Sequence, residues 1–475
     1  MKFLKVLTLG AMLMTLFAAC SKAEPTVQVV TQATEPVQEA PGQELPQNTE
    51  TDVAITLSDT GVQVDGVAIG TDAATAVYES RDIVYYEAGK DFTYGEGDTD
   101  DAHSVDEAAA HTVVHITKPG TYSVTGKLGK GQIAVDLGKD AKDDPNAVVT
   151  LVLSGVDITC EVAPAIIFYN VYECGSGEAT RDVDTSAAGA NVVLTSGTEN
   201  TVRGSYVAKI YKPDSVELCA DGTEVVDAKK LHKYDAAFYS KMSMNVGGTG
   251  TLNIFAENEG LDSEMHLTIN GGNINIQSGN DGINTNEDGV SVTTINGGNL
   301  NILVTGETGE GDGIDSNGWL VINGGAVTAQ ACAFSADAGI DSDMGIYING
   351  GTVIATGSML DRIEDGGQTY AVFNFAQKQN GGKTVTFKDQ NGNTVLDYCP
   401  ENAYSVLIYS SPELKEGTYT LWSDTVQLVG QRGGMTGSMG GGRPNMGGGM
   451  KPPKDFERPE GGKDKPEGMK PPGRF

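Results

Sequence analysis

The chain has 475 residues, and its 64 Asp and Glu residues against 32 Lys and Arg residues give a formal net charge of −32. A surface this acidic repels the phosphates of nucleic acids, which disfavours nucleic-acid binding. The six cysteines stand at irregular spacing, so they predict neither a disulfide framework nor a metal site.

Residues 1–19 have the features of a signal peptide. Two lysines give a charged start, and the apolar core that follows is too short to span a membrane as a helix. The segment ends in Phe17-Ala18-Ala19-Cys20, which resembles the lipobox of bacterial lipoproteins. It predicts cleavage before Cys20, a lipid on its sulfur and an extracellular protein held on the cell surface by that anchor alone. The alternative is an ordinary signal peptide and a free secreted protein.

The next part of the chain changes from a polar tether to strands. Residues 20–50 are rich in Thr, Gln, Glu and Pro and lack aromatic residues, so a disordered tether is expected. Further on, hydrophobic and polar residues alternate with period two, which predicts half-buried strands. These strands are expected within residues 115–126, 132–136, 148–158 and 191–202. The polar stretch 205–235 is interpreted as an insertion on one face.

A repeated phrase marks the C-terminal half. Each copy has Gly, a hydrophobic residue, Asp or Asn, and Ser or Thr, and is followed by Asn-Gly-Gly. The spacing of the Asn-Gly-Gly copies is 26, 27 and 26 residues, and alternating hydrophobic residues flank each one. A constant period with β-type flanks predicts a parallel β-helix whose coils pair at about 4.8 Å. The four turns begin at Asn270, Asn296, Asn323 and Asn349.

Details around the repeats extend this prediction. Residues 237–240 occupy the place of the phrase one coil earlier, and an extra residue in the second copy, at 292–295, is interpreted as a β-bulge. The β-helix is expected over residues 51–357. Strands at 384–387, 406–409 and 419–422 are expected to form a small β cap, within 358–430, that covers the open end. Residues 431–475, rich in Gly, Met, Pro and Lys, are expected to be a disordered tail.

Stacked coils place equivalent polar side chains in columns about 5 Å apart. Ionised carboxylates that close repel each other unless a proton or a cation lies between them. Residues 242–361 contain fifteen acidic residues and no Lys or Arg, and oxygen clusters of Asp, Asn and Glu suit calcium. Turn and ladder roles are the alternative for each residue. The first predicted column holds Asp262, Asn284, Asp315 and Asp341; the second holds Glu259, Asp281 and Asp312; the third holds Glu264, Asn286, Asn317 and Asp343.

Two aromatic residues are candidates for sugar contact. Counting back from the Asn-Gly-Gly turns places Trp319 and Tyr347 on the outer side, next to one another on adjacent coils. Exposed flat rings on a rigid sheet suit stacking against sugars. The alternative is that a loop covers them or that they are isolated surface aromatics.

Several segments together resemble a known family. They are Gly131-Gln132-Ile133, residues 151–159, residues 311–318 and residues 410–414. They resemble a bacterial carbohydrate-binding domain-containing protein family that was long catalogued as a domain of unknown function, and the likeness covers roughly residues 53–425. It implies a right-handed parallel β-helix of pectate-lyase-like shape that binds calcium and polysaccharides such as polygalacturonate or cellulose. Ala338 departs from the acidic pattern of the second column.

The leading interpretation is a non-catalytic, calcium-dependent polysaccharide-binding lipoprotein, expected to be a monomer, whose ligand is a polyuronate or a cellulose-like glucan. One alternative is a pectate-type polysaccharide lyase on the same fold, which would need a Lys or Arg as base beside calcium. The acidic repeat supplies no such residue. The other alternative is a surface adhesin or structural stalk that calcium only stiffens.

Overall fold

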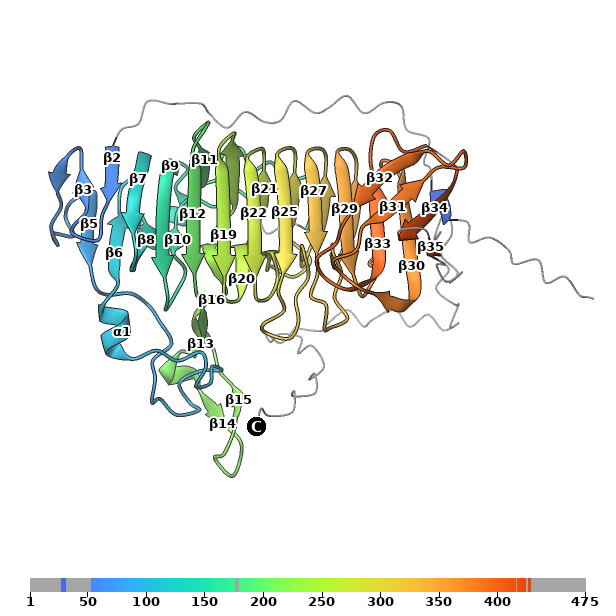
Figure 1. Ribbon diagram of the computed structural model, residues 1–475. Helices are drawn as coiled ribbons and strands as arrows, with labels where there is room; N and C mark the ends of the chain where they lie inside the picture. The colour runs from blue at the N-terminus through green and yellow to red at the C-terminus, as the bar shows by residue number, and fades with distance from the viewer. Residues whose placement is uncertain (1–26, 31–52, 176–178, 416, 424–425, 429–475) are drawn as a thin grey trace, which may run out of the picture. The chain divides into compact units, whose positions relative to one another are not determined.

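The structure, a computed structural model, describes residues 27–30, 53–175, 179–415, 417–423 and 426–428. Within them the fold is all-β, and its helices are the short segments α1 (Val105–Ala109), η1 (Ala141–Asp143) and η2 (Pro213–Ser215) (Figure 1). None of the helices in this described part has the length and hydropathy needed to traverse a bilayer. The predicted signal peptide, Cys20, the C-terminal tail and most of the predicted tether lie outside the described residues.

The strands that precede the Asn-Gly-Gly turns pair in parallel and form what we call the first ladder. Thr268 lies opposite Asn245 on one side and Thr294 on the other, without a shift of register. The strands predicted here are confirmed. The ladder consists of the first halves of β7 (Gly120–Leu128) and β9 (Val149–Cys160), followed by β11 (Ala190–Leu194), β18 (Met244–Gly248), β21 (Leu267–Ile269), β24 (Val292–Ile295), β26 (Trp319–Ile322) and β28 (Gly345–Ile348).

The strands that follow the turns form the second ladder, which faces the viewer in Figure 1. Strands β7 and β9 contribute their second halves to it because they bend, and Gly155 in β9 has a φ of 84° that favours glycine. The other members are β12 (Glu199–Gly204), β19 (Thr251–Ala256), β22 (Asn273–Ser278), β25 (Asn299–Val304), β27 (Ala326–Gln330) and β29 (Thr352–Gly357).

The repeated phrase lies in a third ladder. Leu261 is opposite Phe238 and Ile283, so residues 237–240 do take the place of the phrase one coil earlier. An isolated bridge from Ile283 to Ile314 continues the ladder. Its parallel strands are β6 (Thr112–Ile116), β8 (Gly131–Asp136), β10 (Ile166–Asn170), β17 (Ala236–Ser240), β20 (Glu259–Ser263) and β23 (Ile283–Thr285).

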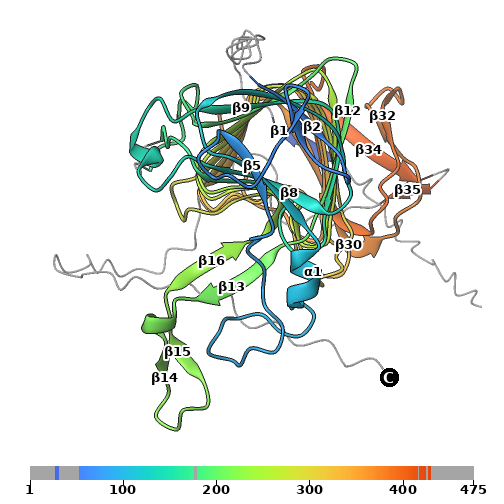
Figure 2. The same cartoon turned by 90° about the vertical axis from the view of Figure 1, so that its left-hand side faces the viewer.

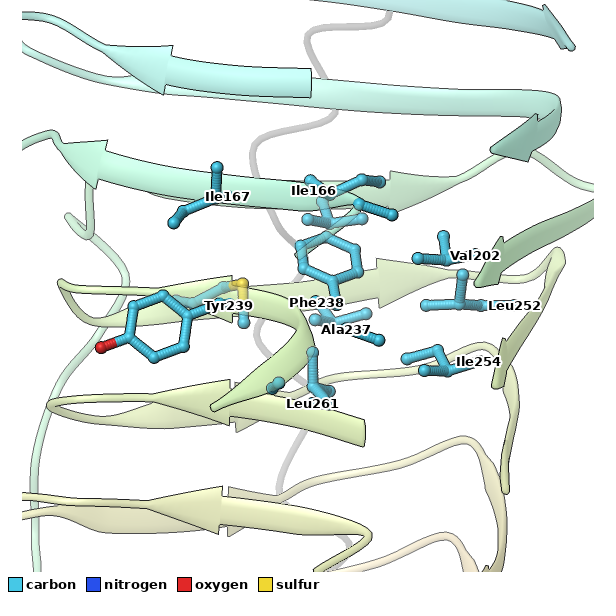
Figure 3. Packing of buried hydrophobic residues seen from close by; sticks show 14 of the residues in the cluster. Ile166, Ile167, Val202, Ala237, Phe238, Tyr239, Leu252, Ile254 and Leu261 are labelled. Carbon is cyan, nitrogen blue, oxygen red and sulfur yellow. The ribbon is translucent and has the colours of Figure 1, made fainter. Parts of the chain in front are cut away.

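The inward side chains of the three ladders belong to one hydrophobic core. Figure 3 shows residues of this core from the second and third ladders. Phe238 and Leu261 from the third ladder meet Ile254 from the second, and each is at most 1% exposed. Burial of a side chain of this size stabilises the fold by about 2 kcal/mol. The alternating hydrophobic residues of the sequence therefore fix which face of each strand points inward.

The turns between the first and second ladders stack along one edge. Asn296 donates its amide N–H to Oδ1 of Asn270 at 2.9 Å, Asn323 donates to Asn296 at 2.9 Å, and Asn349 donates to Asn323 at 2.8 Å. The predicted β-bulge is wrong, because β24 pairs in register with both neighbours. The added length lies in the loop at 286–291, since a corner loop accepts extra residues without breaking ladder hydrogen bonds.

Elements outside the regular coils cover the N-terminal end and one corner. At the N-terminal end lie β2 (Val53–Leu57), β3 (Gln63–Val64), β4 (Val67–Ala68) and β5 (Val77–Ser80). The insertion at 205–235 leaves the coils beside the segment with α1 (Figure 2), and Nζ of Lys209 contacts Oε1 of Glu96 at 2.7 Å. The insertion contains β13 (Val207–Tyr211), β14 (Glu217–Leu218), β15 (Val225–Asp227) and β16 (Lys230–Tyr234).

The C-terminal strands close the other end and have their own aromatic core. In this core the rings of Phe387 and Tyr419 stack with their centroids 4.8 Å apart. The last strand of the second ladder, β29, pairs antiparallel with β33, so its edge is not left open. Within the predicted tether, β1 (Val27–Val30) pairs with β30 and β34. The cap strands are β30 (Tyr370–Gln379), β31 (Val385–Lys388), β32 (Thr394–Tyr398), β33 (Tyr404–Ser410), β34 (Thr418–Ser423) and β35 (Val426–Leu428).

Candidate functional site

The repeated phrase places its polar residues on the outer side of the third ladder. Leu261 points into the core, and Asp262 beside it lies opposite Asn284 of the next coil. The Asp341 N–H donates to the Ile314 carbonyl at 2.7 Å, which continues the same order through the coils beyond β23. The first predicted column therefore stacks in the expected order.

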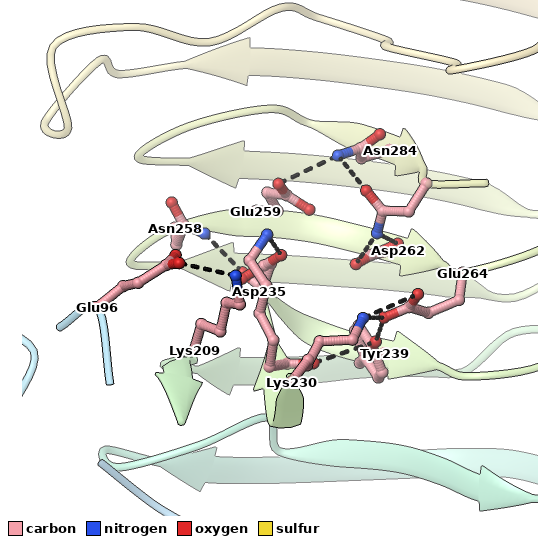
Figure 4. Close-up of polar contacts among 12 residues, drawn as sticks. Glu96, Lys209, Lys230, Asp235, Tyr239, Asn258, Glu259, Asp262, Glu264 and Asn284 are labelled. Atoms are coloured by element: carbon pink, nitrogen blue, oxygen red, sulfur yellow. Dashed lines mark hydrogen bonds and ion pairs between the residues drawn. The ribbon is translucent and has the colours of Figure 1, made fainter. Parts of the chain in front are cut away.

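Three carboxylates form a first acidic cluster at the corner covered by the insertion (Figure 4). Oxygen atoms of Asp235, Glu259 and Asp262 lie within 4.8 Å of one another, and all three residues are buried. The sequence pattern does not identify Asp235, because Ala236, its neighbour, lies opposite Glu259 in the register. The position of Asp235 two residues before 237–240, which take the place of the phrase one coil earlier, is the signal that could have found it.

Burial raises the pKa of the carboxyl groups in this cluster. For Glu259 burial is the largest cause, followed by the charges of Asp262 and Asp235, and its pKa lies well above the usual range. Burial also holds the pKa of Asp262 well above its usual range, with Glu264 as the next cause. These buried carboxylates therefore need either a proton or a bound cation to offset their negative charge.

The insertion supplies lysines to this cluster. Nζ of Lys233 lies 2.6 Å from Oδ2 of Asp235, and Nζ of Lys230 lies 3.0 Å from Oε1 of Glu264. Burial lowers the pKa of Lys233, but nearby carboxylates, Asp235 first, outweigh it and raise the pKa overall. Residues 242–361 contain no Lys or Arg, but at this corner two lysines from outside that stretch offset part of its acidic charge.

Two buried oxygen atoms beside the first acidic cluster have no hydrogen-bond partner. They are Oε2 of Glu259 and Oδ1 of Asn284. The amide of Asn284 donates to the other oxygen of Glu259 at 3.1 Å, and Asn286 donates to Oδ1 of Asp262 at 2.9 Å. A buried oxygen without a partner is costly, and an all-oxygen set fits a hard cation such as calcium.

A second acidic cluster lies further along the same columns. Oxygen atoms of Asp312, Asp315 and Asp341 lie within 4.8 Å of one another, and only Asp341 is not fully buried. Burial, then the charges of Asp281 and Asp315, raise the pKa of Asp312 to about 10. The Ala338 N–H donates to Oδ1 of Asp312 at 2.6 Å, so the residue without a carboxylate still contacts the cluster through its backbone.

The third column supplies no carboxylate to either cluster, although Asn286 donates to Asp262 of the first one. Glu264 accepts from Lys230 and from the Tyr239 hydroxyl, and Asn317 donates to the Asn286 carbonyl at 2.9 Å. Asp343 is exposed. Among the described residues, the carboxylates grouped closely enough to hold a metal ion therefore come from the first and second columns and from Asp235.

Trp319 and Tyr347 lie on the outer side of neighbouring strands and are not directly opposite each other. Trp319 faces Gly345, and Tyr347 faces Val321. The Arg181 guanidinium lies over the Tyr347 ring at 4.3 Å, so a loop from an earlier coil contacts this aromatic residue. The two aromatic residues are therefore offset by two positions along neighbouring strands, and their role in sugar contact stays a prediction.

A family model and a curated relative point to the same family. A family model described as carbohydrate-binding domain-containing protein matches residues 110–371. A curated relative of that description from Acetivibrio thermocellus is 28% identical over 219 residues, and the match spans 46% of this chain and 57% of the relative. A solved polysaccharide lyase-like protein from C. thermocellum, a gadolinium derivative, is 20% identical with a TM-score of 0.38, over 66% of this chain and 94% of that one. With its family model matching more than half of its length, the chain belongs to the carbohydrate-binding domain-containing protein family.

Proposed function

We propose that this protein is a non-catalytic, calcium-dependent polysaccharide-binding lipoprotein of the cell surface, and that its three ladders are the faces of a right-handed parallel β-helix. Membership of the carbohydrate-binding family supports the glycan-binding part of the proposal. The two acidic clusters support the calcium-binding part. The sequence around Cys20 supports the lipid anchor.

The burial of several carboxylates in each cluster carries the proposal. Asp235, Glu259 and Asp262 would hold one ion, and Asp312, Asp315 and Asp341 a second. Because Asp341 is only partly buried, the second acidic cluster is more accessible to solvent than the first. A bound calcium ion would supply the positive charge that a polyuronate needs in order to approach so acidic a chain.

Three basic residues near the columns support binding without catalysis. Lys230 and Lys233 are both held in ion pairs with carboxylates, and Arg362 is paired with Glu364. A lyase of the pectate type would need a basic group that takes a proton from the substrate. These residues instead compensate acidic charge.

Titration calorimetry with a galacturonate oligosaccharide tests the proposal, in calcium and again in EGTA. Binding is expected in calcium only, and Asp315→Asn should weaken it while Asp140→Asn, an exposed aspartate outside the columns, should not. An unsaturated product that absorbs in the near ultraviolet would establish a lyase instead. Calcium-dependent melting without binding to any glycan would establish a structural stalk.

The lipid anchor has its own test. Cells that produce the full precursor should release the Cys20→Ser protein into the medium and retain the wild-type protein in the membrane fraction. Equal release of both proteins would contradict the anchor and leave the glycan-binding proposal unaffected.

A further inference from the structure

A groove crosses the outer side of the second ladder, the face toward the viewer in Figure 1. It consists of two hollows of about 440 and 290 Å³ that share Phe255 and Gln277 as lining residues. The hollows touch strands of the second ladder from β9 to β27. The groove therefore runs along the stacking direction, on a different face from the acidic clusters.

The outer side of the second ladder repeats an amide group from coil to coil, and two members of this row, Asn275 and Asn301, line the groove. Asn253, Asn275 and Asn301 lie opposite one another in register. Asn275 donates to Oδ1 of Asn253 at 2.8 Å, and Asn301 donates to Oδ1 of Asn275 at 3.0 Å. Because an amide carries two N–H groups and two lone pairs, each side chain keeps hydrogen-bonding capacity beyond this ladder. A row of fixed donors and acceptors suits a ligand with many hydroxyl groups.

An aromatic ring and a fixed wall complete the groove. Phe255 is 39% exposed, and the Arg203 guanidinium lies 4.9 Å from its ring centroid. The wall is the cap segment around Tyr398 and Glu401. The Glu401 N–H donates to Oε1 of Gln330 at 2.7 Å, and this bond ties the wall to the floor. Such a ring beside a polar floor is suited to stacking on a sugar.

The charges around the groove exclude an anionic ligand. Glu161, Glu257 and Glu307 line one hollow, and Glu401 lines the other. Arg203 also lines the groove, but its guanidinium contacts Oδ1 of Asp157 at 3.1 Å, which offsets its charge. A polyuronate would meet four carboxylates, of which Glu161 is paired with Lys130, whereas a neutral glycan would not be repelled.

We propose that this groove is a second, calcium-independent binding site for a neutral, extended β-linked polysaccharide that lies along the stacking direction. The coils repeat at about 4.8 Å, close to the length that one pyranose unit adds to such a chain. Successive sugars would therefore meet successive amide groups of the floor. The inference deepens the proposed function, since it assumes that the protein binds polysaccharide.

Titration calorimetry of the full chain in EGTA with a β-1,4-linked glucose hexasaccharide tests the site. The wild-type protein is expected to bind it, and Phe255→Ala should weaken binding by about tenfold. Phe334→Ala, which removes a 77% exposed phenylalanine outside the groove, should have no effect. Gln277→Ala should weaken binding, and Gln377→Ala, an exposed position of the cap, should not. A galacturonate hexasaccharide in EGTA should not bind.

The outcomes separate this inference from the proposed function. Failure of the wild-type protein to bind the glucose hexasaccharide, or equal binding by a folded Phe255→Ala protein, would overturn the groove. Loss of binding in Trp319→Ala alone would move the neutral site to the first ladder and also overturn it. Binding of the glucose hexasaccharide in EGTA without any calcium-dependent binding of the galacturonate would support the groove and contradict the calcium proposal.

Discussion

The Nζ atom of Lys233 lies 2.6 Å from the Oδ2 atom of Asp235, so the insertion carries an ammonium group to carboxylates buried by the coils. Asp262 and Glu259 share this place and are themselves buried. An ammonium group and a metal ion would both neutralise these carboxylates. The lysine and a bound cation therefore stabilise the same cluster in partly redundant ways.

Lys233→Met is expected to lower the free energy of unfolding in EGTA by about 2 kcal/mol, because it leaves a buried carboxylate without its partner. Calcium should increase the free energy of unfolding of this variant by more than it increases that of the wild-type protein. Urea denaturation with and without calcium measures both effects. Lys212→Met, an exposed lysine of the same insertion, is the matched control. An identical calcium response in the two variants would contradict the role of Lys233.

Calcium should raise the melting temperature through the second acidic cluster. An ion that binds only the folded chain stabilises it by about 2.7 kcal/mol at a hundred times its dissociation constant. Differential scanning calorimetry should show this gain shrink in Asp315→Asn and persist in Asp140→Asn. An unchanged melting temperature of the wild-type protein in EGTA would leave the columns as turn and ladder residues only.

The stability in EGTA should fall as the pH rises. The folded pKa of Asp312, about 10, lies above its ordinary value of 3.8, so the folded state holds a proton that the unfolded state releases. This contribution is complete below the ordinary value and is lost as the pH rises toward the folded value, at up to about 1.4 kcal/mol per pH unit. Urea denaturation at several pH values should give a shallower decline for Asp312→Asn. Calcium should reduce the decline in the wild-type protein, because its ligands bind it deprotonated.

The asparagine ladder predicts a difference between its interior and its end. Asn296 both donates to Asn270 and accepts from Asn323, whereas Asn349 donates to Asn323 at the last turn. Asn296→Ala should therefore lower the free energy of unfolding by about 2 kcal/mol and Asn349→Ala by about 1 kcal/mol. Chemical denaturation of both half-buried positions makes the comparison, and equal losses would argue against a continuous hydrogen-bonded row.

The sequence predicts the structure best in the C-terminal half, where the repeat has an almost constant length. The spacing of the asparagines predicts the stacked turns, because a constant number of residues per coil brings equivalent positions into register. The columns that contain Asp262 and Asp312 follow from the same count. Both predictions depend on pairing within the repeat alone.

The remaining features depend on contacts between parts of the chain without a shared period. Lys233 and Asp235 come from the insertion, and Arg181 reaches Tyr347 from an earlier coil. The groove around Phe255 needs a wall from the cap. Long-range contacts of this kind leave no periodic signal in the local pattern of hydrophobic residues.

The antiparallel pairing of β29 with β33 has a consequence for how such a chain evolves. At the opposite end, β2 is paired with β3 in the same antiparallel manner. Interior coils, in contrast, offer equivalent parallel edges above and below. A gene duplication that adds one 26-residue unit would therefore be accommodated between existing coils and not at either terminus. Each added unit would add one asparagine to the row on the second ladder and one position to each acidic column. The groove face and the acidic face would therefore lengthen together.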